Sequence, residues 1–401
     1  MQPRVVVTGR GVICALGRDL NTFSKALQAG TVGIVPILGL PIAAAAPVAD
    51  FNPQAEFSRA QLATFDRSTQ FAVLAARSAL AESGLPAAAE LGPRAAVIVG
   101  CASGSITSIE ESYNALGTAH SRRLHPQTVP RNMPNGPAAH LSLAFGARGP
   151  SLVVNTACAS GATAVALGTY LIRAGLVDMA LVGGTEACLS EGCLRGWEAL
   201  RVLAPDTCRP FSLGRQGLVL GEGSGILLIE SLDHARARGA PVFGEIAGVS
   251  MNSDSYHLLN PSATGQSATM TACLLDAGLS TEEFGYINAH GTATAQNDVT
   301  ETRAIRTVFS EHADRLLVSS TKSMHGHTLG AAGAIEMLAT LDALNHRYAP
   351  PTMNFAEADP ECDLNYVVNQ AQEMNTDTAL SNSFGFGGHN AVLALRSART
   401  V

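Results

Sequence analysis

The chain has 401 residues, of which 46% are hydrophobic and 15% are charged, and its formal net charge is −7. This balance excludes a disordered chain, which needs low hydrophobicity and high net charge, and it provides no basic surface for nucleic acid. The length predicts two domains or one large duplicated domain. Because charges are few and 39 residues are glycine, we expect a large core and a sizeable subunit interface.

Eight cysteines are spread along the chain without a CxxC pair, which argues against zinc-ribbon and thioredoxin-like sites. The N-terminus does not resemble a signal peptide, so we expect a cytoplasmic protein with reduced thiols. Residues 32–49 carry no charge, but three prolines interrupt them and they are barely long enough to span a membrane. We expect an irregular segment covered by the rest of the protein or by a partner subunit, and no membrane contact.

In chain order, short β-branched runs alternate with longer alanine-rich segments. The patterns predict strands at residues 4–9, 95–100, 152–155, 287–288 and 316–320, and helices at residues 69–83 and 162–174, with a further alanine- and glycine-rich segment at 330–344. Strands separated by helices indicate an α/β fold with largely parallel pairing.

The second half of the chain repeats the order of features in the first half. A strand leads into a polar turn and then an alanine-rich segment at residues 152–174, and the same order returns at residues 316–344. An earlier strand in each half also ends in a polar loop. We therefore expect two related α/β halves, at residues 1–240 and 241–401.

Cys158 lies at a predicted strand-to-helix turn among small residues. The N-terminus of the following helix would favour a thiolate, and the backbone N–H of Cys158 could serve an oxyanion. A buried structural cysteine is the alternative, and we assign that alternative to the other seven cysteines.

The second half supplies possible partners for this thiol. His290 follows a strand end, and Lys322 and His327 lie five residues apart on the matching strand-to-helix turn. One histidine alone would be interpreted as structural, but two histidines and a lysine on matching turns are harder to explain by packing. The glycine-rich loop at residues 382–390 could expose backbone N–H groups, or it could be a simple β-turn.

Two other kinds of site fit the sequence less well. Gly9 and Gly11 follow the first strand like a dinucleotide fingerprint, but Cys14 replaces the third glycine and no acidic residue follows for a ribose. His325, His327, His290 and His389 could bind a metal, but no cysteine or carboxylate lies beside them at a recognised spacing. We therefore expect no metal.

Four segments together resemble the β-ketoacyl-acyl-carrier-protein synthases, most closely the elongating synthase II type. They are residues 156–161, 288–294, 320–327 and 382–388, and the resemblance covers essentially the whole chain. The resemblance implies a thiolase-like fold of two duplicated α/β halves in an αβαβα arrangement. It also implies decarboxylating Claisen condensation of malonyl-carrier with an acyl-enzyme thioester, and a Cys-His-His set rather than the Cys-His-Asn of initiating synthases.

The resemblance also assigns roles to individual residues. It implies that Cys158 is the nucleophile, that His290 and His327 donate to the malonyl thioester, and that Lys322 supports the histidines. The N–H groups of Cys158 and Phe386 would form the oxyanion hole, with Phe386 also acting as the gate. Thr292 and Thr294 would contact the pantetheine arm, Phe384 would also contact substrate, and Glu336 would be a buried acid that braces the site. No cofactor is implied, because the substrates are carried on the phosphopantetheine of acyl carrier protein. The expected partners are this carrier and a second subunit, in a homodimer or in a heterodimer with a homologous chain-length subunit.

Some positions depart from the common pattern. His325 and His389 stand where threonine is usual, and the loop at residues 209–217 lacks the usual aspartates. Ser103 replaces a bulky isoleucine, which suggests a specialised acyl pocket of the polyketide, aryl-polyene or nodulation-lipid kind. Two alternatives stay open: a non-catalytic chain-length subunit, which would usually lack the cysteine, and a degradative thiolase, which would carry a second cysteine in the loop at residues 383–390.

Overall fold

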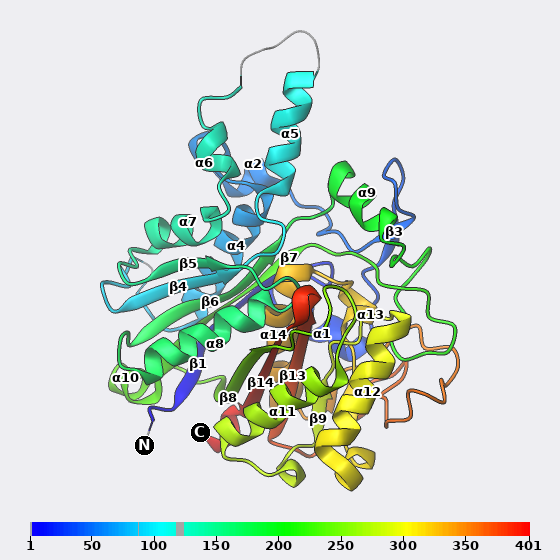
Figure 1. Cartoon of the computed structure of the whole chain (residues 1–401). Coiled ribbons are helices and arrows are strands. Elements are labelled where there is room, and N and C mark those ends of the chain that lie inside the picture. The colour runs from blue at the N-terminus through cyan, green and yellow to red at the C-terminus, as the bar shows by residue number, and fades with distance from the viewer. Residues whose placement is uncertain (1, 87, 118–123) are drawn as a thin grey trace.

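The computed structural model describes residues 2–86, 88–117 and 124–401. Within these residues ten strands form one continuous sheet in the order β10-β9-β13-β14-β8-β1-β7-β6-β4-β5 (Figure 1). The strands are β1 (Val5–Cys14), β4 (Ala95–Gly100), β5 (Ser151–Val154), β6 (Met179–Glu186), β7 (Gly223–Ser231), β8 (Gly244–Ser253), β9 (Tyr286–Asn288), β10 (Leu317–Ser319), β13 (Thr378–Gly385) and β14 (His389–Ser397).

The strand order confirms two related halves. The series β5-β4-β6-β7-β1 is mirrored by β10-β9-β13-β14-β8, and the antiparallel pair of β1 and β8 joins them. The expected boundary at residues 240/241 lies between α10 (Leu232–Ala237) and β8.

The expectation of largely parallel pairing is wrong. Strands β4, β5 and β6 pair in parallel, as do β9, β10 and β13, but every pair among β6, β7, β1, β8, β14 and β13 is antiparallel. The alternation of strands and helices predicts crossovers, whereas β13 and β14 form a hairpin joined by the short turn η4 (Phe386–Gly388).

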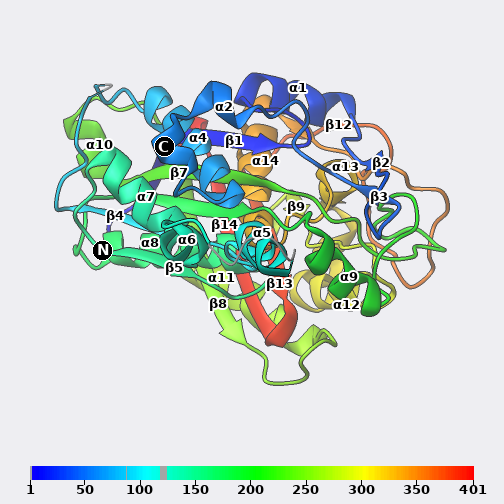
Figure 2. The ribbon, with the colours of Figure 1, turned by 90° about the horizontal axis from the view of Figure 1, so that it is seen from above.

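Helices form three layers around the two halves of the sheet, which confirms the thiolase-like αβαβα fold (Figure 1 and Figure 2). Helices α4 (Arg67–Glu82) and α7 (Gly136–Phe145) cover the first half, and α11 (Ala263–Ala277) packs on the second half with α12 (Ala295–Phe309) beside it. Between the halves lie α8 (Ser160–Arg173) and α14 (Ala332–His346).

Glycines let the central helices approach closely. A Cβ added at Gly161 would lie 2.9 Å from the carbonyl oxygen of Gly330, and one at Gly333 would lie 2.8 Å from the nitrogen of Ala162. This contact brings the turn before α8 next to the turn before α14, so the two chemically rich turns meet in the interior.

The remaining elements are peripheral or short. They are α1 (Leu20–Ala29), β2 (Val35–Pro36), β3 (Ala44–Ala45), α2 (Pro53–Glu56), α3 (Arg59–Leu62), α5 (Ile106–Gly117), α6 (Thr128–Asn132), α9 (Glu191–Ala199), η1 (Thr281–Glu283), η2 (Ser310–Asp314), α13 (Lys322–His325), η3 (Leu329–Ala331), β11 (Tyr348–Ala349), β12 (Gln372–Glu373) and η5 (Ala398–Thr400). Helices α5 and α6 stand out from the body (Figure 1).

The uncharged stretch at residues 32–49 is irregular, as expected. It contains the small β2–β3 hairpin, in which Ala44 and Ala45 are buried, while Leu38 is 96% exposed. Across the described residues, no helix has both the length and the apolar character needed to cross a membrane.

Candidate active site

Cys158 lies in the turn between β5 and α8. The preceding residue, Ala157, has φ +50°, a conformation that costs a non-glycine residue about 1–3 kcal/mol. The Ser160 hydroxyl holds it there, since it accepts from the Thr156 N–H at 2.9 Å and donates to the Ala157 carbonyl at 2.6 Å. Gly100 leaves the necessary space, because a Cβ there would lie 2.3 Å from the carbonyl carbon of Ser160. The turn therefore fixes the sulfur at the start of α8.

The Cys158 thiol is buried, and its surroundings act on its charge in opposite directions. Burial raises its pKa to about 11, whereas the positive charge of Lys322 and the backbone N–H groups of Phe386 and Cys158 lower it. These two N–H groups are the pair expected to form the oxyanion hole. The structure brings both of them to the sulfur, where they could also stabilise an oxyanion formed on an acyl group.

His290 follows β9 on a loop that a buried carboxylate holds. Glu301, on α12, accepts the N–H of His290 and the N–H of Gly291, both at 2.8 Å, and the side-chain amide of Asn382 at 3.1 Å. Glu301 was not among the residues predicted from the sequence. Its signal was an acidic residue on the buried face of a helix that begins just after the histidine loop.

Lys322 lies behind His290. Its ammonium nitrogen is 3.3 Å from Nδ1 of His290 and forms a buried ion pair with Glu336. Because an ammonium group can only donate, Nδ1 of His290 accepts, and the ring proton of the neutral histidine lies on Nε2. The structure thus brings Lys322, Glu336 and His290 together as the sequence implied.

His327 has the same proton arrangement for a different reason. The N–H of Leu329 donates to its Nδ1 at 3.2 Å, so the ring proton is on Nε2. Burial and the nearby charge of Lys322 hold the pKa values of His290 and His327 well below their usual range. The two rings meet edge to face with centroids 5.4 Å apart. The site therefore holds two neutral N–H donors.

One cavity of about 450 Å³ connects most of the expected site. Cys158, His290, His327, Thr292, Thr294, Phe384 and Phe386 all line it. The hydroxyls of Thr292 and Thr294 are 2.9 Å apart, and Thr294 also caps the N-terminus of α12. The ring of Phe384 packs edge to face against His290 with centroids 5.9 Å apart.

Ser103 is not among the residues that line this cavity. It lies on the loop after β4, and its backbone N–H donates to the buried Glu186 at 3.2 Å. The expected contact between Ser103 and an acyl chain stays a prediction.

Phe386 contacts an aromatic residue that the sequence analysis did not consider. The ring of Trp197, on α9, stacks on Phe386 with centroids 6.0 Å apart and planes inclined by 23°. The Phe386 turn is also tied to the loop after β8, since the Gly387 N–H donates to the Leu258 carbonyl at 2.7 Å.

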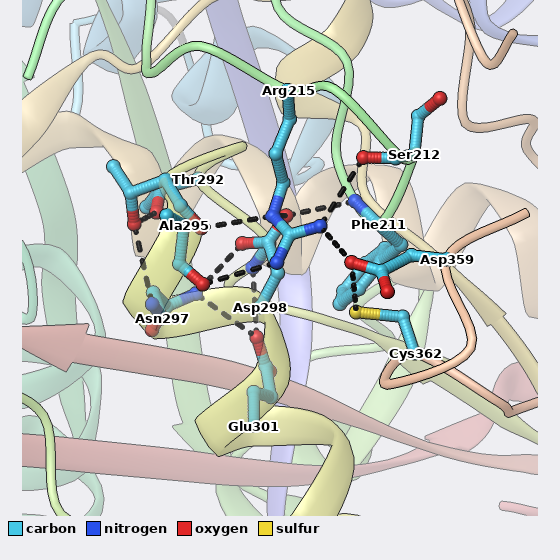
Figure 3. A network of polar contacts seen from close by, with 12 residues as sticks. Phe211, Ser212, Arg215, Thr292, Ala295, Asn297, Asp298, Glu301, Asp359 and Cys362 are labelled. Atoms are coloured by element: carbon cyan, nitrogen blue, oxygen red, sulfur yellow. Dashed lines mark hydrogen bonds and ion pairs between the residues drawn. The ribbon is translucent and has the colours of Figure 1, made fainter. Parts of the chain in front are cut away.

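Arg215 pins the loop at residues 209–217 to the wall of the cavity (Figure 3). Its guanidinium donates to the carbonyls of Thr294 at 3.1 Å and Ala295 at 3.0 Å, and forms ion pairs with Asp298 and Asp359. The carboxylates that pair with this loop thus come from α12 and from a later loop.

His325 and His389 are not among the residues that line the cavity with Cys158, His290 and His327. Both ring nitrogens of His325 contact its own turn, at the Gly326 carbonyl and the Thr321 hydroxyl, and His389 lines a separate cavity. In the described ranges we find no group of three or more His, Cys, Asp or Glu side chains that could hold a metal ion.

Comparison with known proteins identifies the family. The family "Beta-ketoacyl synthase, N-terminal domain" matches residues 2–235, and "Beta-ketoacyl synthase, C-terminal domain" matches residues 243–356. The chain belongs to the β-ketoacyl synthase family. It is accordingly a condensing enzyme of the acyltransferase type.

Several relatives match over nearly their whole length. Nodulation protein E of Rhizobium sp. (strain N33) is 45% identical, covering 99% of this chain and 100% of the relative. The 3-oxoacyl-[acyl-carrier-protein] synthase 2 of Coxiella burnetii is 39% identical, covering 98% of each.

Two solved structures are also similar, each covering 99% of this chain and 100% of their own. The ishigamide ketosynthase/chain length factor has a TM-score of 0.93 at 35% identity. A type II PKS acyl-carrier protein in complex with its ketosynthase has a TM-score of 0.90 at 32% identity.

Proposed function

We propose that this condensing enzyme works through Cys158 as nucleophile and through His290 and His327 as paired donors, on substrates carried by acyl carrier protein. The observation that carries the assignment is the meeting of one thiol and two neutral imidazoles in a single cavity. Such a site suits a reaction in which one thioester is first transferred to the enzyme and a second is then activated.

In the first half-reaction, the sulfur of Cys158 attacks the acyl thioester. A sulfur–carbon bond forms at Cys158, the bond to the carrier sulfur breaks, and the carrier leaves as a thiol. The N–H groups of Phe386 and Cys158 stabilise the tetrahedral oxyanion. Because burial keeps the free thiol protonated near neutral pH, its proton must leave as the attack occurs, and the departing carrier sulfur takes up a proton in turn.

In the second half-reaction, malonyl-carrier enters and loses CO2. The electron pair of the broken carbon–carbon bond becomes an enolate, whose oxygen accepts from the Nε2–H groups of His290 and His327. The enolate carbon attacks the acyl carbonyl, the sulfur of Cys158 leaves and takes up a proton, and 3-oxoacyl-carrier is released. Neutral rings suit this role, since each keeps a proton to donate without creating a charge that the buried site would disfavour.

The carrier arm enters along the cavity wall that contains Thr292 and Thr294. Their hydroxyls offer hydrogen bonds to the amides of pantetheine, and Arg215 fixes the carbonyls beside them. The enzyme needs no cofactor of its own, because the reactive thioesters arrive on the carrier. Its site of action is the cytoplasm.

The active form is a dimer. Exposed apolar side chains follow α5, α6, α7 and the edge strand β5: Tyr113, Leu116, Leu124, Val129, Met133, Leu143 and Leu152. Apolar exposure on this scale is typical of a subunit interface. A homodimer is the main form proposed, and a heterodimer with a homologous chain-length subunit is the alternative.

The substrate is a specialised acyl chain. Ser103 supports this assignment, since it stands where a bulky residue is common, and so does the 45% identity to Nodulation protein E. The intact Cys158 disfavours a non-catalytic chain-length subunit. A thiolase is disfavoured because residues 383–390 contain no second cysteine.

Reconstitution tests the function. Wild type and Cys158→Ala are incubated with purified acyl-carrier and malonyl-carrier, and the masses of the carriers are measured by mass spectrometry. Wild type should convert malonyl-carrier to 3-oxoacyl-carrier, and the variant should not. Absence of 3-oxoacyl-carrier with a panel of acyl groups would contradict the proposal.

A further inference from the structure

Glu186 is a buried carboxylate that the mechanism does not use. It is the last residue of β6 and is 0% exposed. Its two oxygens accept backbone N–H groups from Ala102 at 2.9 Å, Ser103 at 3.2 Å and Gly330 at 3.0 Å. A buried charge is costly unless other groups compensate it, and these peptide groups come from both halves of the fold.

One branch of these contacts leads to the nucleophile. The carbonyl of Ala102 accepts the side-chain amide of Asn155 at 2.7 Å, and the Asn155 side-chain oxygen accepts the N–H of Ala157 at 3.1 Å. Ala157 is the left-handed residue before Cys158. Glu186 thus supports the loop that holds the strained turn.

The other branch leads to a catalytic histidine. Gly330 follows Leu329, whose φ of +44° is also left-handed. The N–H of Leu329 donates to Nδ1 of His327 and so keeps the ring proton on Nε2. By holding the next peptide N–H, Glu186 stabilises the conformation of Leu329 that this bond requires.

We propose that Glu186 is a positioning residue that couples the Cys158 turn to the His327 turn, so that one carboxylate sets the geometry for both half-reactions. The inference rests on the proposed roles of Cys158 and His327. It adds that the two halves of the fold are linked through this carboxylate, since Glu186 accepts N–H groups from Ala102 in the first half and from Gly330 in the second.

The charge of Glu186 is sensitive to pH near neutrality. Burial raises its pKa to about 7, while the N–H groups of Ala102, Gly330 and Ser103 lower it. The titratable groups facing it are thiols that stay protonated in this range, because burial and the charge of Glu186 raise their pKa values: Cys101, Cys158, Cys188 and Cys193. A protonated Glu186 loses acceptor capacity, so both turns loosen as the pH falls through about 7.

The test compares Glu186→Gln and Glu186→Asp with wild type between pH 6 and pH 9. Acylation of Cys158 is followed by mass, and CO2 release from malonyl-carrier is followed on acylated enzyme. We expect Glu186→Gln to slow both half-reactions about tenfold above pH 7 and to reduce the loss of rate that wild type shows below pH 7, while Glu336, whose pKa burial also raises to about 7, stays unchanged in the variant. Glu186→Asp should restore part of the pH dependence. Glu245→Gln is the matched control, since Glu245 is also a buried carboxylate but forms an ion pair with Arg4.

A second variant keeps the test decisive if Glu186→Gln does not fold. Asn155 is exposed, and Asn155→Ala removes its hydrogen bonds to Ala102 and Ala157, which break the branch toward Cys158 and leave the branch toward His327 intact. Loss of a hydrogen bond of this kind should slow acylation by about two- to tenfold and leave CO2 release on acylated enzyme unchanged. If Asn155→Ala acylates normally, or if Glu186→Gln keeps the wild-type pH profile, the coupling is refuted. Wild-type turnover in the same assay tests the proposed function separately.

Discussion

Replacing His327 with alanine should separate the two half-reactions. The ring of His327 is buried and its Nε2–H is free to donate into the cavity, because Nδ1 is occupied by the N–H of Leu329. One donor to a developing oxyanion typically contributes about 10²–10³-fold in rate, or about 2.7–4 kcal/mol. We therefore expect CO2 release from malonyl-carrier to fall by about 10²–10³-fold in His327→Ala.

Transfer of the acyl group to Cys158 should lose much less, because the proposed oxyanion hole for that step consists of the backbone N–H groups of Phe386 and Cys158, both of which approach the Cys158 sulfur. The assay measures release of labelled CO2 from malonyl-carrier and the mass gain of the Cys158 peptide from acyl-carrier. His389→Ala is the matched control, since His389 lines a separate cavity. Equal losses in the two half-reactions would refute this division of roles and would make His327 a structural residue.

Three further outcomes are expected. Because Lys322 lowers the pKa of Cys158, Lys322→Met should raise that pKa, and alkylation of the thiol at pH 8 should slow by about tenfold for each unit of increase. Lys25→Met, on the exposed side of α1, is the control. An unchanged alkylation rate in Lys322→Met would contradict the electrostatic role. Trp197 is the chain's single tryptophan and stacks on Phe386, so its fluorescence should change when wild type is acylated but not when Cys158→Ala is treated in the same way. Identical spectra before and after acylation of wild type would argue against movement of the Phe386 gate. Ser103→Ile should slow acylation by long or rigid chains far more than by short ones, and a uniform change across an acyl-carrier series would exclude Ser103 from the acyl channel.

The sequence predicted the elements whose causes are local. The buried strand at residues 95–100 coincides with β4, and the helix expected at residues 69–83 is α4 within two residues at either end. Cys158 was found because it lies on a turn of small residues after a strand, and His290 because it follows a strand end on a loop of small and hydroxyl residues. Such a turn has a recognisable composition whatever its tertiary surroundings are.

Contacts between distant segments could not be predicted in this way. Glu186 accepts N–H groups from residues 84 and 144 positions away, and no local pattern marks a carboxylate that binds backbone groups. Arg215 is similar, since its partners Asp298 and Asp359 come from α12 and from a later loop. The prediction of largely parallel strand pairing was wrong for the same reason, because the direction of pairing depends on how β7 and β8 return across the molecule.

A chase experiment on Cys158 tests the central claim most directly. Purified enzyme is first acylated with acyl-carrier, and the carrier is removed. Malonyl-carrier is then added, and the masses of the Cys158 peptide and of the carriers are measured at intervals by mass spectrometry. The account predicts that the acyl mass resides on the Cys158 peptide and leaves it at the rate at which 3-oxoacyl-carrier appears. An acyl mass on another residue, or 3-oxoacyl-carrier that forms without loss of the acyl group from Cys158, would contradict it.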